Sequence, residues 1–94
     1  MELSLHQLDQ IISLSAKFSA TLTLIRSGQI KPYLKKSEAY RIFGRQQVDE
    51  WVQQRELGVT KDGDHSATWR IDRMNIELIA FRNILTAILE ASEN

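Results

Sequence analysis

The stretch SEAYRIFGRQQVDEWV, residues 37–52, decides how the chain is interpreted. Two short segments with helical spacing of apolar residues flank Gly44, and the second begins with Arg45 and two glutamines. Glycine is the residue most often found just past a helix end, because it adopts positive φ without a steric cost. The pattern therefore predicts a helix-turn-helix that reads DNA. Asp49 and Glu50 complicate this interpretation, because both would then face a polyanion.

The two helices of this motif have separate sequence signals. Ser37 is a suitable N-cap for a first helix over Glu38–Phe43. A second helix is expected over Arg45–Arg55, because three of its apolar residues share one face, which we expect to be buried: Val48, Trp51 and Val52. The residues that then point outward are Gln46, Gln47, Asp49, Glu50, Gln53 and Gln54.

Upstream of the motif, residues 3–27 carry apolar side chains at three- and four-residue steps, which predicts a long helix. Gly28 is placed to end it. The segment ATLTLI, residues 20–25, also alternates in polarity, so a strand there is a competing prediction. Residues 29–36 are expected to be an extended lead-in, because Pro32 disfavours a helical conformation at the residue before it.

Downstream, Asp62-Gly63 is a turn signal between two segments of strand character, which predicts a β-hairpin over roughly 58–61 and 67–71. Asp72 is then expected to cap a long helix that ends near Ala91. Five of its apolar residues follow the alternating four- and three-residue spacing of a coiled-coil face: Met74, Leu78, Phe81, Leu85 and Ile88. Further isoleucines lie off that face, so the helix needs two packing surfaces.

These elements predict a mainly α protein with a small β-hairpin, in one structural domain. A winged helix-turn-helix core over 29–73 would be flanked by an N-terminal helix over 1–28 and a C-terminal helix over 74–94. One packing surface of the last helix is expected to be its own domain and the other a second chain. The dimer interface is predicted at Phe18, Leu22, Leu78, Phe81, Leu85 and Ile88.

Composition and charge narrow the function classes. The 94 residues have zero net charge, but residues 26–45 hold six lysine or arginine residues against one glutamate, a net charge of +5. A basic segment therefore leads into the motif, while the sequence after it is acidic. There is no cysteine, which excludes disulfides and thiol catalysis and fits a cytoplasmic location. Lys17 interrupts the longest apolar stretch, so no membrane span is expected.

The order of elements gives the chain a family resemblance. PYLKKSEAYRIFG, followed by VDEWV and then by a hairpin ending in WRIDRMNIELIAF, resembles the excisionase-like and MerR-type winged-helix proteins. It is especially similar to small helix-turn-helix proteins of bacterial phages and mobile elements. The resemblance covers roughly residues 32–82 and rests on the order and spacing of common pieces. The turn after Gly44 is shorter here than is usual in the family.

The resemblance implies that the second helix enters the major groove and that the wing and nearby cations hold phosphate. The backbone contacts it implies are Lys35, Lys36, Arg41, Arg45, Lys61 and Arg70. The base-reading residues it implies are Gln46, Gln47, Glu50, Gln53 and Gln54. Glutamine pairs well with adenine and a carboxylate can accept from cytosine, so adenine- and cytosine-biased reading is expected. A competing interpretation is that these polar residues solvate the face of a packing helix.

Other sites have little support in the sequence. KDGDHS, residues 61–66, lacks the glycine position and the distal glutamate of a calcium loop. His6 and His65 stand without metal-ligand clusters, so no metal and no cofactor is expected. No catalytic constellation is present, so we expect no enzyme and no small-molecule ligand. The prediction is a non-catalytic binder of double-stranded DNA, acting as a homodimer or higher oligomer. The alternative is a helical protein–protein interaction module.

Overall fold

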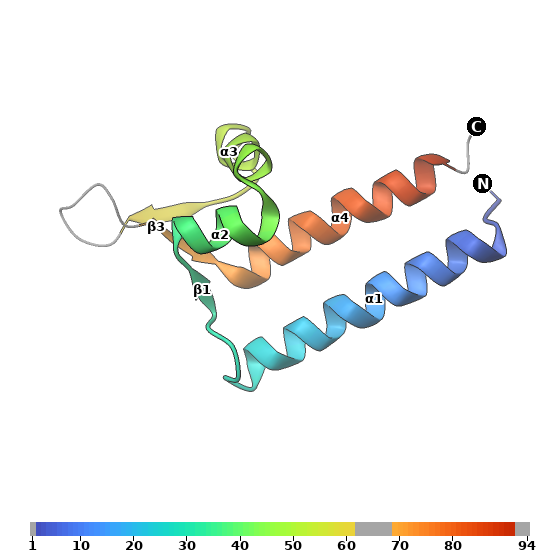
Figure 1. The fold of residues 1–94 in the computed structure, drawn as a ribbon, viewed down its shortest axis with the longest axis horizontal. Helices are drawn as coiled ribbons and strands as arrows, with labels where there is room; N and C mark the ends of the chain where they lie inside the picture. Colours follow the sequence, from blue (N-terminus) through green and yellow to red (C-terminus); the bar gives the residue numbers. More distant parts are fainter. Residues whose placement is uncertain (1, 62–68, 92–94) are drawn as a thin grey trace.

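The computed structural model describes residues 2–61 and 69–91 and arranges them as helices around a small antiparallel sheet (Figure 1). In chain order the elements are α1 (Leu5–Arg26), β1 (Tyr33–Leu34), α2 (Lys36–Phe43), α3 (Arg45–Gln53), β2 (Val59–Lys61), β3 (Trp69–Asp72) and α4 (Arg73–Ala91). This confirms the prediction of a mainly α fold with a small β element. We call residues 33–72 the winged unit, and α1 with α4, which run antiparallel side by side, the arm.

A single residue separates α2 from α3. Gly44, at φ 91°, donates its N–H to the Tyr40 carbonyl at 2.9 Å and accepts from the Val48 N–H at 3.1 Å. It therefore ends one helix and begins the next. Because an L side chain rarely adopts that φ, glycine is the residue suited to so short a turn.

The predicted N-cap of α2 at Ser37 is wrong, because the helix begins at Lys36. Lys35 is the extended residue before the helix, and the Glu38 carboxylate accepts its N–H at 3.1 Å. The Glu38 carboxylate thus satisfies a backbone donor at the helix start.

The second helix of the motif is shorter than predicted, ending at Gln53 rather than Arg55. Arg55 adopts a left-handed conformation, φ 61°. Its N–H bonds to the Val52 carbonyl at 3.1 Å, and the next N–H bonds to the Trp51 carbonyl at 2.9 Å. These two bonds form a Schellman motif, which turns the chain so that Leu57 enters the core, 2% exposed.

The helix α1 ends just before Gly28, as predicted, and its end carries the same pair of hydrogen bonds. That residue has φ 79° and donates to the Ile25 carbonyl at 3.1 Å, while the following Gln29 N–H reaches the Leu24 carbonyl at 2.9 Å. The competing prediction of a strand over residues 20–25 is wrong, because this segment is continuous helix.

The sheet has three strands in the order β1-β3-β2, where the sequence predicted two. Leu34 of β1 and Val59 of β2 both lie opposite Ile71 of the central strand, which is fully buried. The Arg73 N–H extends the β1 pairing by bonding to the Pro32 carbonyl at 2.9 Å. The predicted turn at Asp62-Gly63 lies outside the described residues.

The prediction that Asp72 caps α4 is confirmed. Its Oδ1 accepts from the N–H groups of Met74 and Asn75 at 2.9 and 3.3 Å. The helix then packs its first turns against the winged unit, which completes one cluster of buried residues: Leu34, Ala39, Val48, Trp51, Leu57, Ile71, Ile76 and Ile79. The core is therefore concentrated in the winged unit and the first turns of α4.

Candidate nucleic-acid interface

The helix α3 presents the outward face that the sequence predicted. Val48 is fully buried and Trp51 is 5% exposed, and the Phe43 ring lies edge-on to the Trp51 ring at 6.1 Å between centroids. These contacts fix the rotation of the helix about its axis. The predicted base-reading side chains are consequently all exposed: Gln46, Gln47, Glu50, Gln53 and Gln54.

Asp49 differs from those neighbours, because its carboxylate is engaged within the chain. The Tyr40 hydroxyl donates to its Oδ1 at 2.6 Å, and the Arg45 Nε lies 3.8 Å from its Oδ2. The hydrogen bond to Asp49 raises the pKa of Tyr40, with burial and the charge of Asp49 acting in the same direction and Arg45 opposing them. Asp49 therefore does not stand on the outer face as an isolated negative charge.

Lys36 connects the first helix of the motif to the wing. Its Nζ lies 4.3 Å from the centroid of the Trp69 ring and 5.7 Å from that of Tyr40, and the two rings meet edge-on at 6.4 Å. A cation over an aromatic face is attracted by the ring quadrupole. Sequence reasoning missed this contact, although the spacing of Lys36 and Tyr40, one helical turn apart, was a signal for half of it.

Arg70 occupies a different surface of the sheet. Its guanidinium lies 3.8 Å from the centroid of the Tyr33 ring, which is 42% exposed. Alternation along β3 places Arg70 on the face of the sheet opposite to that of the buried Ile71. Arg70 also borders a shallow depression of about 180 Å³ that Lys31, Lys35 and Trp69 line.

Glu38 also lines this depression and brings a negative charge into the basic region. The backbone hydrogen bond from Lys35 lowers the pKa of Glu38, with the charges of Lys31, Lys35 and Arg41 contributing and burial opposing. The carboxylate is therefore already matched to nearby cations, and the region keeps an excess of positive charge.

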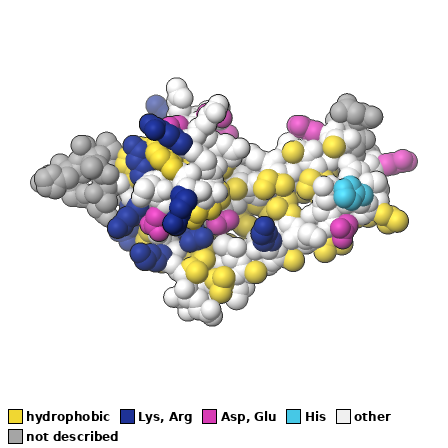
Figure 2. Space-filling view, viewed as in Figure 1, with side chains coloured by type: hydrophobic (Ala, Val, Ile, Leu, Met, Phe, Trp, Pro, Cys, Tyr) yellow, Lys and Arg dark blue, Asp and Glu magenta, His cyan; other side chains and the backbone are white. Residues whose placement is uncertain are grey.

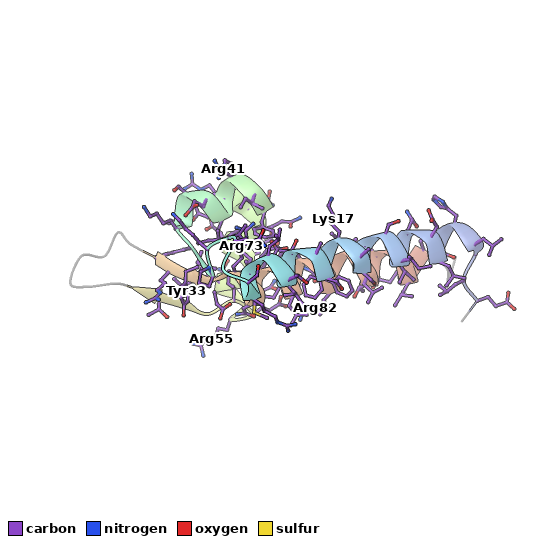
Figure 3. All side chains as sticks on the ribbon, turned by 90° about the horizontal axis from the view of Figure 1, so that it is seen from below. Lys17, Tyr33, Arg41, Arg55, Arg73 and Arg82 are labelled. Carbon is purple, nitrogen blue, oxygen red and sulfur yellow. The ribbon has the colours of Figure 1, made fainter. Side chains whose placement is uncertain are left out.

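The structure gathers most of the predicted phosphate-binding residues around α2. Figure 2 shows lysine and arginine side chains over the end of the molecule that holds α2 and β1, with the arm carrying few. Arg41 is exposed on α2 and points to the side opposite Arg55 (Figure 3). Lys61 lies in β2 opposite Trp69 by its backbone, and its side chain lies outside the described residues.

The predicted dimer-interface residues have mixed positions. Phe18 of α1 and Phe81 of α4 pack on each other within one chain, with ring centroids 4.7 Å apart. Leu78 is 54% exposed, whereas the remaining three predicted residues are half-buried: Leu22, Leu85 and Ile88. The face of α4 predicted for a second chain is therefore partly covered by α1 of the same chain.

An ion pair lies where the arm joins the winged unit. The Arg73 Nε is 3.6 Å from a carboxylate oxygen of Glu77, with the two side chains 20% and 18% exposed, and this nitrogen has no hydrogen-bond acceptor among the described residues. Burial raises the pKa of Glu77, and Arg73 opposes that shift. Sequence reasoning did not single out this pair, although its four-residue spacing was visible.

Within residues 2–61 and 69–91, no three His, Cys, Asp or Glu side chains come together as metal ligands. No helix in those ranges has the length and apolarity to cross a membrane. The segment 61–66 and His65 fall almost wholly outside the described residues. The chain matches no protein-family model, no curated protein and no solved structure.

Proposed function

We propose that the chain is a non-catalytic DNA-binding protein that contacts double-stranded DNA through α3 and the cations beside it. The observation that carries the proposal is an exposed, amide-rich helix with one cation at its start and a second cation on the adjoining helix. Arg45 lies at the first position of α3, and Lys36 lies one turn along the adjoining helix from Tyr40, which both cations contact. A helix start favours phosphate, because its free N–H groups point outward.

The side chains divide into two roles. Lysine and arginine contacts to phosphate fix position without carrying sequence information, whereas groups that reach base edges provide specificity. Lys36 and Arg45 belong to the first class in this proposal. Gln46, Gln47 and Gln53 belong to the second, because glutamine can bond an adenine edge with two hydrogen bonds.

A dimer follows from the small size of this interface. One nine-residue helix with a single cation at its start offers few contacts, so two copies bound to two half-sites would gain from effective concentration. The family resemblance implies two roles for such a dimer: transcriptional regulation or an accessory function in recombination of a mobile element.

Binding to a pool of random duplexes, measured across a salt series, tests the proposal. We expect Lys36→Ala and Arg45→Ala each to weaken binding to every duplex. Each should also reduce the salt slope, the slope of the logarithm of the binding constant against the logarithm of salt concentration, by roughly 1, the value for one lost phosphate contact. Lys17→Ala is the matched control, because it removes the same charge from α1 rather than from α2 or α3 (Figure 3). If the wild-type protein binds no duplex of the pool at low salt, the proposal is overturned.

Base reading is tested separately. Gln47→Ala is expected to leave the salt slope unchanged and to alter preference at one base pair by roughly 1–3 kcal/mol. Selection of bound sequences from the random pool, repeated with the variant, measures that change. Uniform weakening across all sequences would assign Gln47 to the packing interpretation instead.

The alternative function, a protein–protein module, is favoured by one observation: apolar side chains stand exposed along the arm. Leu5 is 85%, Ile12 67% and Ile84 50% exposed. Ile12→Asp tests oligomerisation more cleanly than a change at Phe81, which would disturb the pair with Phe18 inside one chain. An oligomer that survives Ile12→Asp and Ile84→Asp, measured by sedimentation, would count against this alternative.

A further inference from the structure

Asp49 joins the two helices of the helix-turn-helix through both carboxylate oxygens. Oδ1 accepts the Tyr40 hydroxyl of α2 at 2.6 Å, and Oδ2 lies 3.8 Å from the Nε of Arg45, one turn earlier on α3. The Arg45 guanidinium also lies 5.6 Å from the centroid of the Tyr40 ring. Tyr40, Asp49 and Arg45 thus contact one another in a closed set of three.

This set holds an arginine that remains open to solvent. The Arg45 side chain is 79% exposed, while the Asp49 side chain is 46% exposed. An exposed ion pair adds little to fold stability, because water screens it and both side chains lose rotamer freedom. The contact instead restricts the directions that the Arg45 guanidinium samples before any ligand arrives.

We propose that Asp49, together with Tyr40, is a positioning residue for DNA binding, which orients Arg45 toward a phosphate. This inference rests on the proposed function. Restricting a side chain in advance reduces the conformational entropy that binding would otherwise remove. A carboxylate on the DNA-facing helix then supports binding through its neighbour, although its own charge repels phosphate.

Glu50 provides the matched comparison. It is the next residue, carries the same charge and is exposed on the outward face. Charge alone makes the same forecast for Glu50→Gln and Asp49→Asn: removal of a carboxylate near DNA strengthens binding. The positioning role makes opposite forecasts for the two. On the pool of random duplexes, where any base contact of Glu50 is averaged over all sequences, we expect Glu50→Gln to strengthen binding and Asp49→Asn to weaken it, each by about two- to fivefold at low salt.

A double-mutant cycle isolates the contact between the two residues. Arg45→Ala is expected to weaken binding clearly in the wild-type chain and much less in the Asp49→Asn chain, where the arginine is no longer oriented. Tyr40→Phe keeps both charged groups and removes the hydroxyl, so it should weaken binding in the same direction as Asp49→Asn. Urea unfolding of each variant shows whether the fold is kept. Equal effects of Arg45→Ala in both backgrounds would overturn the inference.

A measurement without DNA tests the contact itself. In a Tyr33→Phe chain, Tyr40 is the one remaining tyrosine, and its titration is followed by ultraviolet absorbance. The groups that face its hydroxyl and ring are Asp49, Arg45 and Lys36. Asp49→Asn should lower the pKa of Tyr40 toward its ordinary value, because the hydrogen bond to Asp49 is the largest cause of the upward shift. No change in that pKa would overturn the inference.

The outcomes separate the two proposals. If the wild-type protein binds duplexes and Asp49→Asn strengthens binding as Glu50→Gln does, the positioning role is overturned and DNA binding stands. If the wild-type protein binds no duplex at low salt, the proposed function falls and the positioning role falls with it. Opposite signs for the two variants, with a lowered Tyr40 pKa, support both proposals.

Discussion

The winged unit and the arm use their apolar residues in different ways. In the winged unit, Ile71 and Val48 are fully buried, and six of its residues join the core cluster. In the arm beyond Ile79, no described residue of α4 is fully buried, and α1 contributes Ile25 at 8% exposure. One region therefore has a packed interior, whereas the other has two helices that cover each other on one side.

This difference has a physical consequence for stability. Burial of apolar surface is the main favourable contribution to folding, so the winged unit and the first turns of α4 should hold most of the free energy of unfolding. The far end of the arm is held by fewer contacts, such as the hydrogen bond from the Gln7 side chain to the Ile88 carbonyl at 3.1 Å. The proposed DNA-binding part should therefore be the more stable one, and the amide hydrogens of the arm should exchange with solvent more readily.

The largest expected effect tests the core. Ile71→Ala removes a fully buried side chain from the central strand, and we expect a loss of roughly 2–5 kcal/mol in the free energy of unfolding. Ile84→Ala, at a site that is 50% exposed, should change it by about 0.5 kcal/mol or less. Urea denaturation followed by circular dichroism measures both. Similar losses for the two variants would remove the contrast between winged unit and arm.

The next effect is local to the arm. Phe18→Ala removes one ring of the pair with Phe81 and leaves a half-buried gap, with an expected loss of about 1–3 kcal/mol. Amide hydrogen exchange should then quicken in α1 and the far half of α4 while Val48 and Ile71 stay protected, because the arm can open separately from the core. Equal quickening in β3 would instead indicate one cooperative unit.

A smaller pair of effects compares the two Schellman motifs, one at the end of α1 in the arm and one at the end of α3 in the winged unit. Gly28→Ala places a Cβ at φ 79°, where no atom beyond the neighbouring residues of the chain lies within 4 Å, so backbone strain should account for the loss of about 1–2 kcal/mol. Arg55→Gly relieves the corresponding strain at φ 61° and should raise stability by about 0.5–1 kcal/mol. Thermal unfolding checks both signs, and a destabilised Arg55→Gly protein would point to a contact of that side chain.

The smallest effect concerns the junction of the two regions. Burial raises the pKa of Glu77 above 4.5, so the folded state takes up a proton more readily than the unfolded state. That contribution makes the wild-type protein gain stability relative to Glu77→Gln as pH falls from 7 toward 4.5, with no further gain below. Paired urea titrations at several pH values measure the difference. A gain on raising the pH would instead show that Arg73 outweighs burial and lowers the pKa of Glu77.

Local patterns predicted the elements well, because their causes are local. The spacing of Val48 and Trp51 gave the buried face of α3, and Asp72 gave the start of α4 through its side-chain oxygen. The start of α2 was predicted too late in the sequence. The Glu38 carboxylate accepts the N–H of Lys35, so the helix begins before Ser37, the residue expected to be its N-cap. The strand β1 was missed, because two residues are too few to display alternation.

The contacts of the candidate site depended on geometry that the sequence does not carry. Tyr40 and Asp49 are nine residues apart, and they meet because the one-residue turn at Gly44 sets the angle between two helices. Lys36 and Trp69 meet because of how α2 lies against β3. The outward side chains of α3 followed from periodicity, whereas the engagement of Asp49 required the tertiary arrangement.

The way the two arm helices join the sheet has a mechanical consequence. The helix α4 continues directly from the central strand β3. The helix α1 is linked through residues 27–32 to the edge strand β1, and β1 pairs with β3. Each helix of the arm is therefore connected to one of two hydrogen-bonded strands, α1 to β1 and α4 to β3 (Figure 1). Spreading the far ends of α1 and α4 would load the pairing of Tyr33–Leu34 with Ile71–Asp72, unless the linker yields first. If the linker holds, a force that separates the tips acts on the β1–β3 pairing, at the edge of the sheet just before the start of α2.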